Sequence, residues 1–333
     1  MSEPCRVSTT IDFDAAGKQF GALSVPYSSN ESAWGAVRIP IVVIKGGAGP
    51  TLLCVGGNHG DEYEGPIALG KLARRLEAAD IAGRLILLPA LNLPAVLAGT
   101  RVSPLDQINL NRTFPGRWDG TVTEMIADYV TRRILPLCDA VVDLHSGGKT
   151  LHFLPFCGMH VLEDADQMAR TRAAMLAFGA PFSVIIDEFD RLGMLDTAVE
   201  QLGKVFLFTE LGGGGTATAA TIAIAERGVR NLLHHLGMFE GAPEPAATRL
   251  MHSPDPSYFV VSEDRGIFEI MVDPGAEVSA GQPIARIHDV ESPARAPATY
   301  RAERSGLLVG RRWPGPTRPG DCLAVIATER EPR

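Results

Sequence analysis

The sequence predicts an α/β protein with a mixed, mainly parallel central sheet flanked by helices, followed by a smaller all-β domain. Short apolar runs alternate with segments of helical spacing between residues 51 and 240. Several runs are apolar on both faces, which is typical of strands covered by helices on both sides. Near residue 240 the composition shifts to proline-rich stretches and then to short strands. These patterns together favour an α/β layer fold joined to a β-rich unit.

Five apolar runs account for the predicted strands. The first, VRIPIVVIKGG, belongs to a β-rich lead-in over residues 1–50 and ends in glycines. The other four lie in the alternating region and read TLLCVGG, RLILLPAL, AVVDLH and KVFLFTEL. Because these four runs are short and continuous, we expect them to be buried strands of one sheet.

Three segments carry apolar residues at helical spacing, namely residues 65–80, 123–135 and 216–236. Pro66 suits the first helical position of the first segment. Thr123 is a candidate N-cap of the second segment. We therefore expect three helices that pack their apolar faces on the sheet.

The stretches GAPEPA and SPDPS indicate a linker after the last predicted helix. The short strands that follow carry turn signals and no long helical pattern. The predicted domains are therefore residues 1–242, which include the β-rich lead-in, and residues 253–330, which form the all-β unit.

The composition narrows the classes of partner. A formal net charge of −8 argues against general affinity for nucleic acid or for an anionic membrane surface. No apolar run reaches roughly 18 residues, so no membrane span is expected. The N-terminus lacks a secretion signal pattern, and five scattered cysteines without a CxxC pair fit a cytoplasmic protein. The oligomeric state stays open, and a homo-oligomer is compatible with the sequence.

Predicted strands end at residues that can bind a metal ion. TLLCVGG leads into NHGDE, which contains His59 and Glu62, and AVVDLH ends at His145. Ligands of parallel sheets bind beyond the carboxyl ends of the strands. Two imidazoles and a carboxylate, with one open position for water, describe a catalytic Zn²⁺ site. A hydrogen-bonded core histidine is the alternative interpretation of His145 alone, and the other histidines, His160 among them, lack such a pattern.

KVFLFT ends at Glu210, which precedes Leu211 and four glycines. Glu210 could cap the next helix, pair with an arginine or act as a fourth metal ligand. It could also be the general base that takes a proton from water and returns it to the leaving nitrogen. Asp143, two residues before His145, could orient that histidine or form a salt bridge at the strand end.

The polar segment GTRVSPLDQINLNRTFPG contains Arg101, Asn111 and Arg112. Arginine binds carboxylates in a bidentate manner, and one near a metal ion could stabilise an oxyanion. Asn111 and Arg112 together could hold a substrate carboxylate. A salt bridge within the loop, to Asp106 or Asp119, is the alternative interpretation.

The motifs NHGDEYEG, NLNRTFPG, DLHSGG and TELGGGG, in this order, resemble the succinylglutamate desuccinylase/aspartoacylase family, relatives of the zinc carboxypeptidases. The resemblance covers roughly residues 45–330 and implies a zinc-carboxypeptidase-like fold whose first domain is a zinc-hydrolase catalytic domain. It implies one Zn²⁺ per chain, held by His59, Glu62 and His145.

The same resemblance implies the roles of the remaining candidates. Glu210 matches the general acid/base, and Arg101 matches the arginine that polarises the scissile carbonyl. Asn111 and Arg112 match the pair that grips the α-carboxylate of the substrate. The implied partner is a small-molecule N-acyl amino acid, whose amide bond is hydrolysed.

Within this family, the form GGNHGDEYEGPIA with a β-rich lead-in most resembles the deacetylases of ectoine degradation. These act on Nα-acetyl-L-2,4-diaminobutyrate and release acetate. One alternative is a deacylase of the aspartoacylase or succinylglutamate desuccinylase type, which would need extra cationic contacts. Others are a zinc carboxypeptidase acting on peptides and a non-enzymatic binding protein, against which the complete ligand set argues.

The C-terminal segment GIFEIMVDPGAEVSAGQPIARI resembles the hairpin of a biotinyl/lipoyl-like sandwich. Such domains carry their cofactor on a lysine, whereas the last lysine of this chain is Lys204. The resemblance therefore implies a barrel-sandwich-like domain that has a structural role or restricts access to the site.

Overall fold

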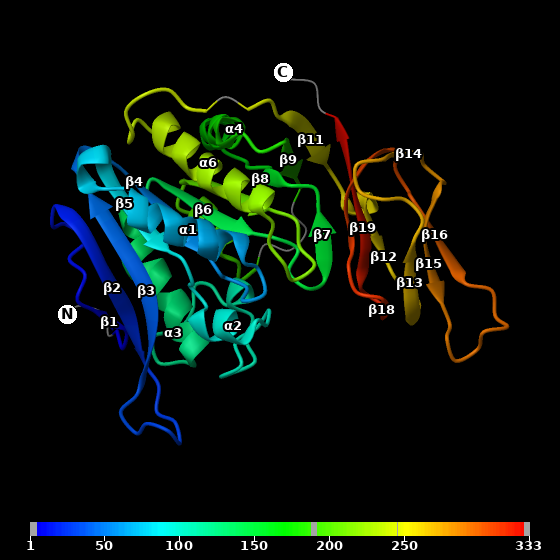
Figure 1. The fold of residues 1–333 in the computed structure, drawn as a ribbon, viewed down its shortest axis with the longest axis horizontal. Helices are drawn as coiled ribbons and strands as arrows, with labels where there is room; N and C mark the ends of the chain where they lie inside the picture. Colours follow the sequence, from blue (N-terminus) through cyan, green and yellow to red (C-terminus); the bar gives the residue numbers. More distant parts are fainter. Residues whose placement is uncertain (1–4, 188–191, 245, 330–333) are drawn as a thin grey trace.

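The structure, a computed structural model, describes residues 5–187, 192–244 and 246–329. Figure 1 shows a body of helices around a sheet, with strands of the C-terminal part at one side. None of the described helices is long and apolar enough to cross a membrane. The α-helices are α1 (Glu64–Arg75), α2 (Leu93–Ala98), α3 (Val122–Tyr129), α4 (Ala165–Phe178), α5 (Leu195–Glu200) and α6 (Ala219–His235).

The described strands form a large and a small sheet. The large sheet has the order β1-β2-β3-β5-β4-β6-β10-β8-β9-β11-β19-β17-β14, with β12 paired to β19 and β7 to β17. Its strands are β1 (Ser8–Thr9), β2 (Gly17–Pro26), β3 (Ala36–Lys45), β4 (Gly47–Gly56), β5 (Ala82–Leu88), β6 (Ala140–His145), β7 (Leu151–Phe153), β8 (Phe156–His160), β9 (Phe182–Ile186), β10 (Val205–Glu210), β11 (Arg249–Ser253), β12 (Phe259–Val261), β14 (Glu277–Val278), β17 (Gly306–Arg312) and β19 (Cys322–Glu329). The small sheet has the order β16-β15-β13-β18. Its strands are β13 (Gly266–Ile270), β15 (Pro283–His288), β16 (Ala298–Arg301) and β18 (Pro316–Thr317).

The centre of the large sheet is parallel. β4 runs parallel to β5 and β6, and β6 runs parallel to β10. Beyond β10, the strands β8, β9 and β11 are parallel to one another, but β8 is antiparallel to β10. The predicted mixed sheet is therefore confirmed, with parallel strands at its centre and antiparallel pairing among β1, β2 and β3 and among the C-terminal strands.

Helices cover both faces of this sheet, which explains why the run from Leu52 to Val55 in β4 is apolar at every position. Leu52 and Cys54 pack in the core beneath α1, α4 and α6. Leu53 and Val55 point to the opposite core, which α3 and α5 cover. All four side chains are fully buried, because successive residues of a strand face opposite sides.

The three predicted helices are confirmed as α1, α3 and α6. The predicted N-terminal positions of α1 and α3 are wrong. Thr121, not Thr123, caps α3: its hydroxyl accepts from the Glu124 amide, and the Glu124 carboxylate accepts from the Thr121 amide. Thr123 is buried and instead donates to Asp106. Pro66 is the third residue of α1, because that helix begins at Glu64.

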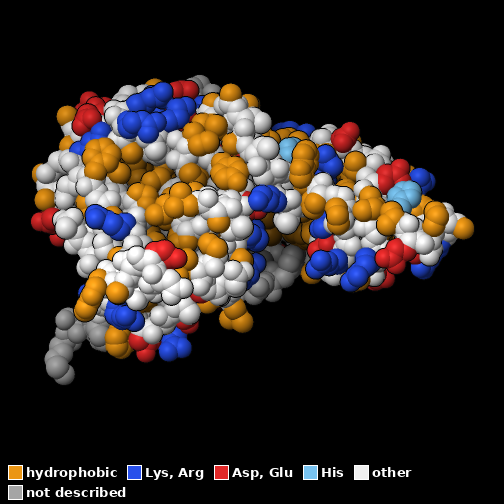
Figure 2. Space-filling view, turned by 60° about the horizontal axis from the view of Figure 1, so that its bottom comes forward, with side chains coloured by type: hydrophobic (Ala, Val, Ile, Leu, Met, Phe, Trp, Pro, Cys, Tyr) orange, Lys and Arg blue, Asp and Glu red, His pale blue; other side chains and the backbone are white. Residues whose placement is uncertain are grey.

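The C-terminal part is antiparallel and all-β, as predicted. Its strand β19 pairs with β11, and its strand β17 pairs with β7, so it continues the large sheet. Figure 2 shows it as a narrower extension of the body. The boundaries 1–242 and 253–330 remain predictions, and positions 1 and 330 lie outside the described residues.

Candidate active site

The site lies where three parallel strands end side by side. β4 ends at Gly56, β6 at His145 and β10 at Glu210. The register pairs Gly56 with Leu144 and Glu210 with His145. The turn that follows β4 therefore meets the carboxyl ends of β6 and β10 at one edge of the sheet, where such folds bind ligands.

The turn after β4 needs its glycine because it packs tightly on α2. A Cβ atom at Gly60 would lie 2.0 Å from the carbonyl carbon of Ala95. The Gly60 amide also donates to the carbonyl of Thr100 at 3.0 Å. Asp61 accepts from the Lys149 amide at 2.8 Å and so braces the loop after β6. Glycine and Asp61 thus hold the backbone from which the ligands project.

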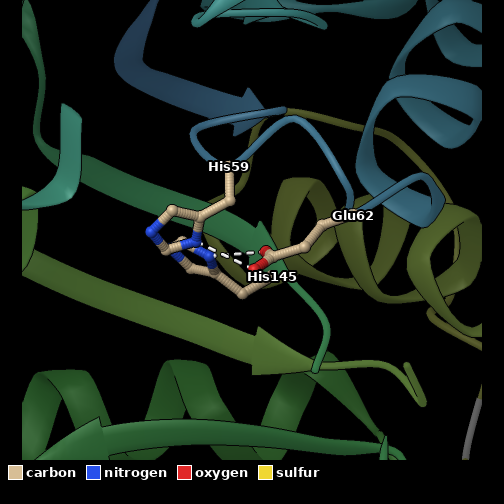
Figure 3. Close-up of side chains that lie close together, drawn as sticks. All are labelled: His59, Glu62 and His145. Atoms are coloured by element: carbon tan, nitrogen blue, oxygen red, sulfur yellow. Dashed lines mark hydrogen bonds and ion pairs between the residues drawn. The ribbon is translucent and has the colours of Figure 1, made fainter. Parts of the chain in front are cut away.

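His59, Glu62 and His145 converge on one point, as Figure 3 shows. Glu62 Oε1 lies 2.8 Å from His59 Nδ1, and Glu62 Oε2 lies 2.8 Å from His145 Nδ1. The candidate ligand atoms all lie within 4.8 Å of one another. The Ser146 amide donates to Glu62 Oε2 at 3.1 Å and helps to fix the carboxylate. This arrangement can hold one cation.

The other nitrogen of each imidazole faces an oxygen acceptor. His145 Nε2 lies 2.8 Å from Asp143 Oδ2, and His59 Nε2 lies 3.2 Å from Asn109 Oδ1. With Nε2 as donor in both rings, both Nδ1 lone pairs point at the Glu62 carboxylate, an arrangement that a shared cation stabilises. The two imidazole nitrogens and the carboxylate oxygen form a donor set that suits Zn²⁺, and each of the three side chains is held in place by a hydrogen-bond partner. The residues present therefore fit a zinc ion.

The carboxylates in and behind this cluster make it a favourable site for a cation. Burial alone would lower the pKa of His145, but the carboxylates of Asp143 and Glu62 raise it well above its ordinary value. Burial dominates at His59 and lowers its pKa. Burial would raise the pKa of Glu62, but His59 and His145 outweigh it and lower that pKa. An ionised carboxylate between two imidazoles favours a divalent cation in place of a proton.

Glu210 lines the same pocket as the cluster but does not belong to it. Burial and the nearby charge of Glu62 raise the pKa of Glu210 to about 8. Its Oε2 atom is buried and has no hydrogen-bond partner among the described residues. Thr218 caps α6, so Glu210 is not the cap of that helix. Of the alternatives, these observations favour a proton-transferring group.

The predicted arginines and asparagine reach the same pocket. Arg101 is partly exposed, and its Nη1 lies 3.4 Å from Glu62 Oε1. Asn111 Oδ1 accepts from the Leu195 amide at 3.0 Å, which leaves the Asn111 Nδ2 group for a ligand. Arg112 donates to the carbonyl of Asn111 at 2.6 Å.

The two acids proposed as loop partners of these arginines have other partners. Asp106 accepts from the amide and hydroxyl of Thr123, both at 2.9 Å. Asp119 lies 3.4 Å from Arg117. The alternative of a salt bridge to Asp106 or Asp119 thus loses its support.

One pocket of about 320 Å³ is lined by all seven predicted residues: His59, Glu62, Arg101, Asn111, Arg112, His145 and Glu210. Sequence reasoning missed the rest of its lining, which comprises His160, Ile186, Met194, Asp196, Phe206, Phe208 and Phe259. His160 could have been found, because FCGMH is an apolar run that ends in a histidine, as AVVDLH is. Asp196 has no comparable sequence signal.

Two other cavities differ in chemistry. A cavity of about 590 Å³ lies in the C-terminal part, and none of the predicted site residues lines it. A cavity of about 360 Å³ shares Arg101 and Glu210 with the pocket and reaches Arg312 and Cys322. The pocket at the strand ends is therefore the candidate site, and C-terminal residues line a space next to it.

Known proteins match this chain along nearly all of its length. It is 52% identical over 329 residues to the N-alpha-acetyl-L-2,4-diaminobutyric acid deacetylase of Halomonas elongata, covering 98% of this chain and 96% of that relative. The product-bound ectoine utilization protein EutE (DoeB) from Ruegeria pomeroyi is 51% identical, with a TM-score of 0.95 over 98% of this chain and 100% of that one. A succinylglutamate desuccinylase/aspartoacylase from Rhodobacter sphaeroides is 41% identical, with a TM-score of 0.94 and the same coverage.

The catalytic-domain model of one family matches residues 48–236, which include all seven predicted site residues. The match covers more than half of the chain and agrees with the family that the four motifs indicate. The prediction of an enzyme that acts as a deacylase is confirmed by the same match and by the deacetylase relative. The chain therefore belongs to the succinylglutamate desuccinylase/aspartoacylase family.

Proposed function

We propose that this enzyme deacetylates Nα-acetyl-L-2,4-diaminobutyrate to diaminobutyrate and acetate in ectoine degradation. The proposal rests on one observation above all: all seven predicted residues line a single pocket of about 320 Å³. The 52% identity to the Halomonas elongata deacetylase supports the choice of substrate. The five free cysteines support the predicted cytoplasmic location.

The side chains of the pocket divide the work of amide hydrolysis. Arg112 and the Nδ2 group of Asn111 hold the α-carboxylate of the substrate. Arg101 donates to the oxygen of the scissile carbonyl as negative charge develops there. Glu210 takes a proton from the attacking water and returns it to the leaving amine. Without a metal ion, burial and the charge of Glu62 raise the pKa of Glu210 to about 8, so a nearby cation is needed to favour the carboxylate form that accepts the proton.

We propose Zn²⁺ as the cation of the cluster, held by His59, Glu62 and His145. When bound, zinc would polarise the acyl carbonyl, activate water and, by its positive charge, lower the pKa of Glu210. Asp143 and Asn109 hold the two imidazoles in the orientation that this cation requires.

Two other activities compete with this proposal. A deacylase for acidic substrates needs a cationic group for the second carboxylate, yet Arg101 and Arg112 are the only basic residues, histidines aside, in the described lining. A peptide-cleaving carboxypeptidase would share the proposed metal chemistry, and hydrolysis of a peptide against hydrolysis of an N-acyl amino acid separates the two activities.

The test is an acetate- and amine-release assay on zinc-loaded enzyme. The panel comprises Nα-acetyl-L-2,4-diaminobutyrate, N-acetyl-L-aspartate, N-succinyl-L-glutamate and a dipeptide. We expect the first compound to have the highest kcat/KM by at least tenfold. A higher kcat/KM for an acidic substrate or for the dipeptide would refute the proposed substrate.

A further inference from the structure

A buried carboxylate lies in the substrate pocket away from the proposed metal cluster. Asp196 is only 7% exposed, lies in the first turn of α5 and lines the pocket. None of the roles proposed for the side chains of this pocket involves Asp196. Because burying a charge without a matching counter-charge is costly, the presence of this carboxylate in the pocket needs an explanation.

The fold fixes Asp196 next to the proposed carboxylate clamp. The Phe114 amide donates to the carbonyl of Gly193 at 2.9 Å, and the Leu195 amide donates to Asn111 Oδ1 at 3.0 Å. A Cβ atom at Gly193 would lie 2.5 Å from the carbonyl oxygen of Arg112. The chain that leads into Asp196 is therefore packed directly against the clamp.

Apolar side chains separate Asp196 from Glu210. Phe206, Phe208 and Glu210 are alternate residues of β10 that all line the pocket, so this wall is roughly 13 Å long. His160 stacks on Phe208 with ring centroids 5.2 Å apart, and Leu195 and Val199 of α5 pack with Phe206 in one core. Asp196 thus lies toward the phenylalanine end of the wall, where methylene groups of a ligand would find apolar contacts.

Within the described part of the chain, the positive charge at this end of the pocket does not match the negative charge. Asp196 Oδ1 accepts from the amide and hydroxyl of Thr197, whereas Oδ2 has no hydrogen-bond partner among the described residues. His160 Nδ1 lies 3.0 Å from Glu200 Oε1. Even a protonated His160 balances only one of the two carboxylates, Asp196 and Glu200. Among the described residues, one negative charge at this end of the pocket therefore has no matching positive charge, and a cationic ligand group would neutralise it.

We propose that Asp196 binds the side-chain ammonium group of the substrate and makes the enzyme selective for N-acyl diamino acids with short side chains. The clamp of Asn111 and Arg112 takes the carboxylate, the apolar wall takes the methylenes, and Asp196 takes the ammonium. This inference rests on the proposed deacylase function and names the residue that selects the amino acid.

The test compares kcat/KM for Nα-acetyl-L-2,4-diaminobutyrate and Nα-acetyl-L-norvaline, which replaces the ammonium by a methyl group. Wild-type enzyme prefers the diamino substrate, and Asp196→Asn lowers kcat/KM for it by roughly 10- to 100-fold, mainly through KM. The same variant retains or improves its activity on the norvaline compound, which also shows that it is folded. Thr197→Ser is the matched control, since it alters the same turn of α5 but keeps the hydroxyl that donates to the Asp196 carboxylate.

The outcomes separate this inference from the proposed function. Equal losses of Asp196→Asn on both substrates, or no loss on either, would overturn the role of Asp196 and leave the deacylase standing. A wild-type enzyme that hydrolyses neither compound would overturn both. Calorimetric titration of L-2,4-diaminobutyrate into metal-free protein gives a second readout, in which Asp196→Asn weakens binding and Thr197→Ser does not.

Discussion

At the scale of single residues, the orientation of the histidines depends on partners behind them. Asp143 lies 2.8 Å from His145 Nε2 and also accepts from Asn58 at 2.8 Å. We expect Asp143→Asn to weaken zinc binding by 10- to 100-fold, because the amide no longer holds the imidazole by charge. Competition with a chromogenic chelator measures this affinity.

Asp139 provides a matched control for that substitution. It precedes β6 at the opposite end from His145, and it accepts from the Thr51 amide at 2.7 Å. Asp139→Asn should leave zinc affinity unchanged. Equal weakening in both variants would mean that Asp143 acts through the stability of β6 and not through the imidazole.

Substitutions of Arg101 and Arg112 should have different effects on the kinetic constants. Arg101 lies beside Glu62, so Arg101→Ala should lower kcat by roughly 10²–10³ with unchanged zinc content. Arg112→Ala should chiefly raise KM, since a carboxylate clamp acts in the ground state as well as in the transition state. Steady-state kinetics with zinc analysis checks both, and a normal KM for Arg112→Ala would argue against the clamp.

Glu210 should couple stability to pH in the metal-free protein. Its pKa is about 8 in the folded state, against an ordinary value of 4.5. Between these values the folded state keeps a proton that the unfolded state releases, so stability falls as pH rises from about 4.5 to about 8. Glu210→Gln removes this contribution. Urea unfolding should therefore show a larger gain in the free energy of unfolding for the variant at pH 8 than at pH 5.5. An equal gain at both pH values would contradict the raised pKa of Glu210.

The residues of the site could be predicted where an apolar strand ends in a histidine or a glutamate. His59, Glu62, His145 and Glu210 each lie within two residues of a glycine after an apolar run. Asp196 could not, because it lies in a short helix whose packing against the clamp is set by long-range contacts. Sequence spacing carries no information about such contacts.

At the scale of elements, the turn after β4 depends on its close contact with α2. A methyl group at Gly60 would meet the backbone of Ala95, so Gly60→Ala should destabilise the protein by about 1–3 kcal/mol and weaken zinc binding. Gly70→Ala is the control, because its methyl group would meet nothing closer than 3.7 Å inside α1. That control should stabilise by about 0.5–1 kcal/mol. Chemical denaturation measures both, and a Gly60→Ala variant as stable as wild type would show that α2 can move away.

Helices with a clear apolar stripe were predictable, and the others were not. α1 and α6 have the expected spacing, and each packs on the sheet. α4 mixes small and charged residues on all sides, as ADQMARTRAAMLAF indicates, so its sequence lacks a marked face. α2 and α5 span only six residues each, which is too short for periodicity to be informative.

At the scale of the whole molecule, the body and the C-terminal strands share a hydrophobic core. Phe156 and Met251 of the body pack with Leu307, Val309 and Val325 of the C-terminal part. Because neither part can bury these side chains alone, we expect one cooperative thermal transition. Scanning calorimetry with equal calorimetric and van't Hoff enthalpies would agree, whereas two separate transitions would mean that the parts unfold independently.

The pairing of β17 with β7 connects the C-terminal part to residues 146–150, the loop that follows His145. The segment from His145 to β7 is five residues long, and Trp313, just after β17, stacks on His152 within β7. A change in the curvature of the C-terminal sheet would consequently displace His145, the third proposed metal ligand. Substitutions that never contact a substrate could retune turnover in this way, so directed evolution of this enzyme should sample the C-terminal strands as well as the pocket walls.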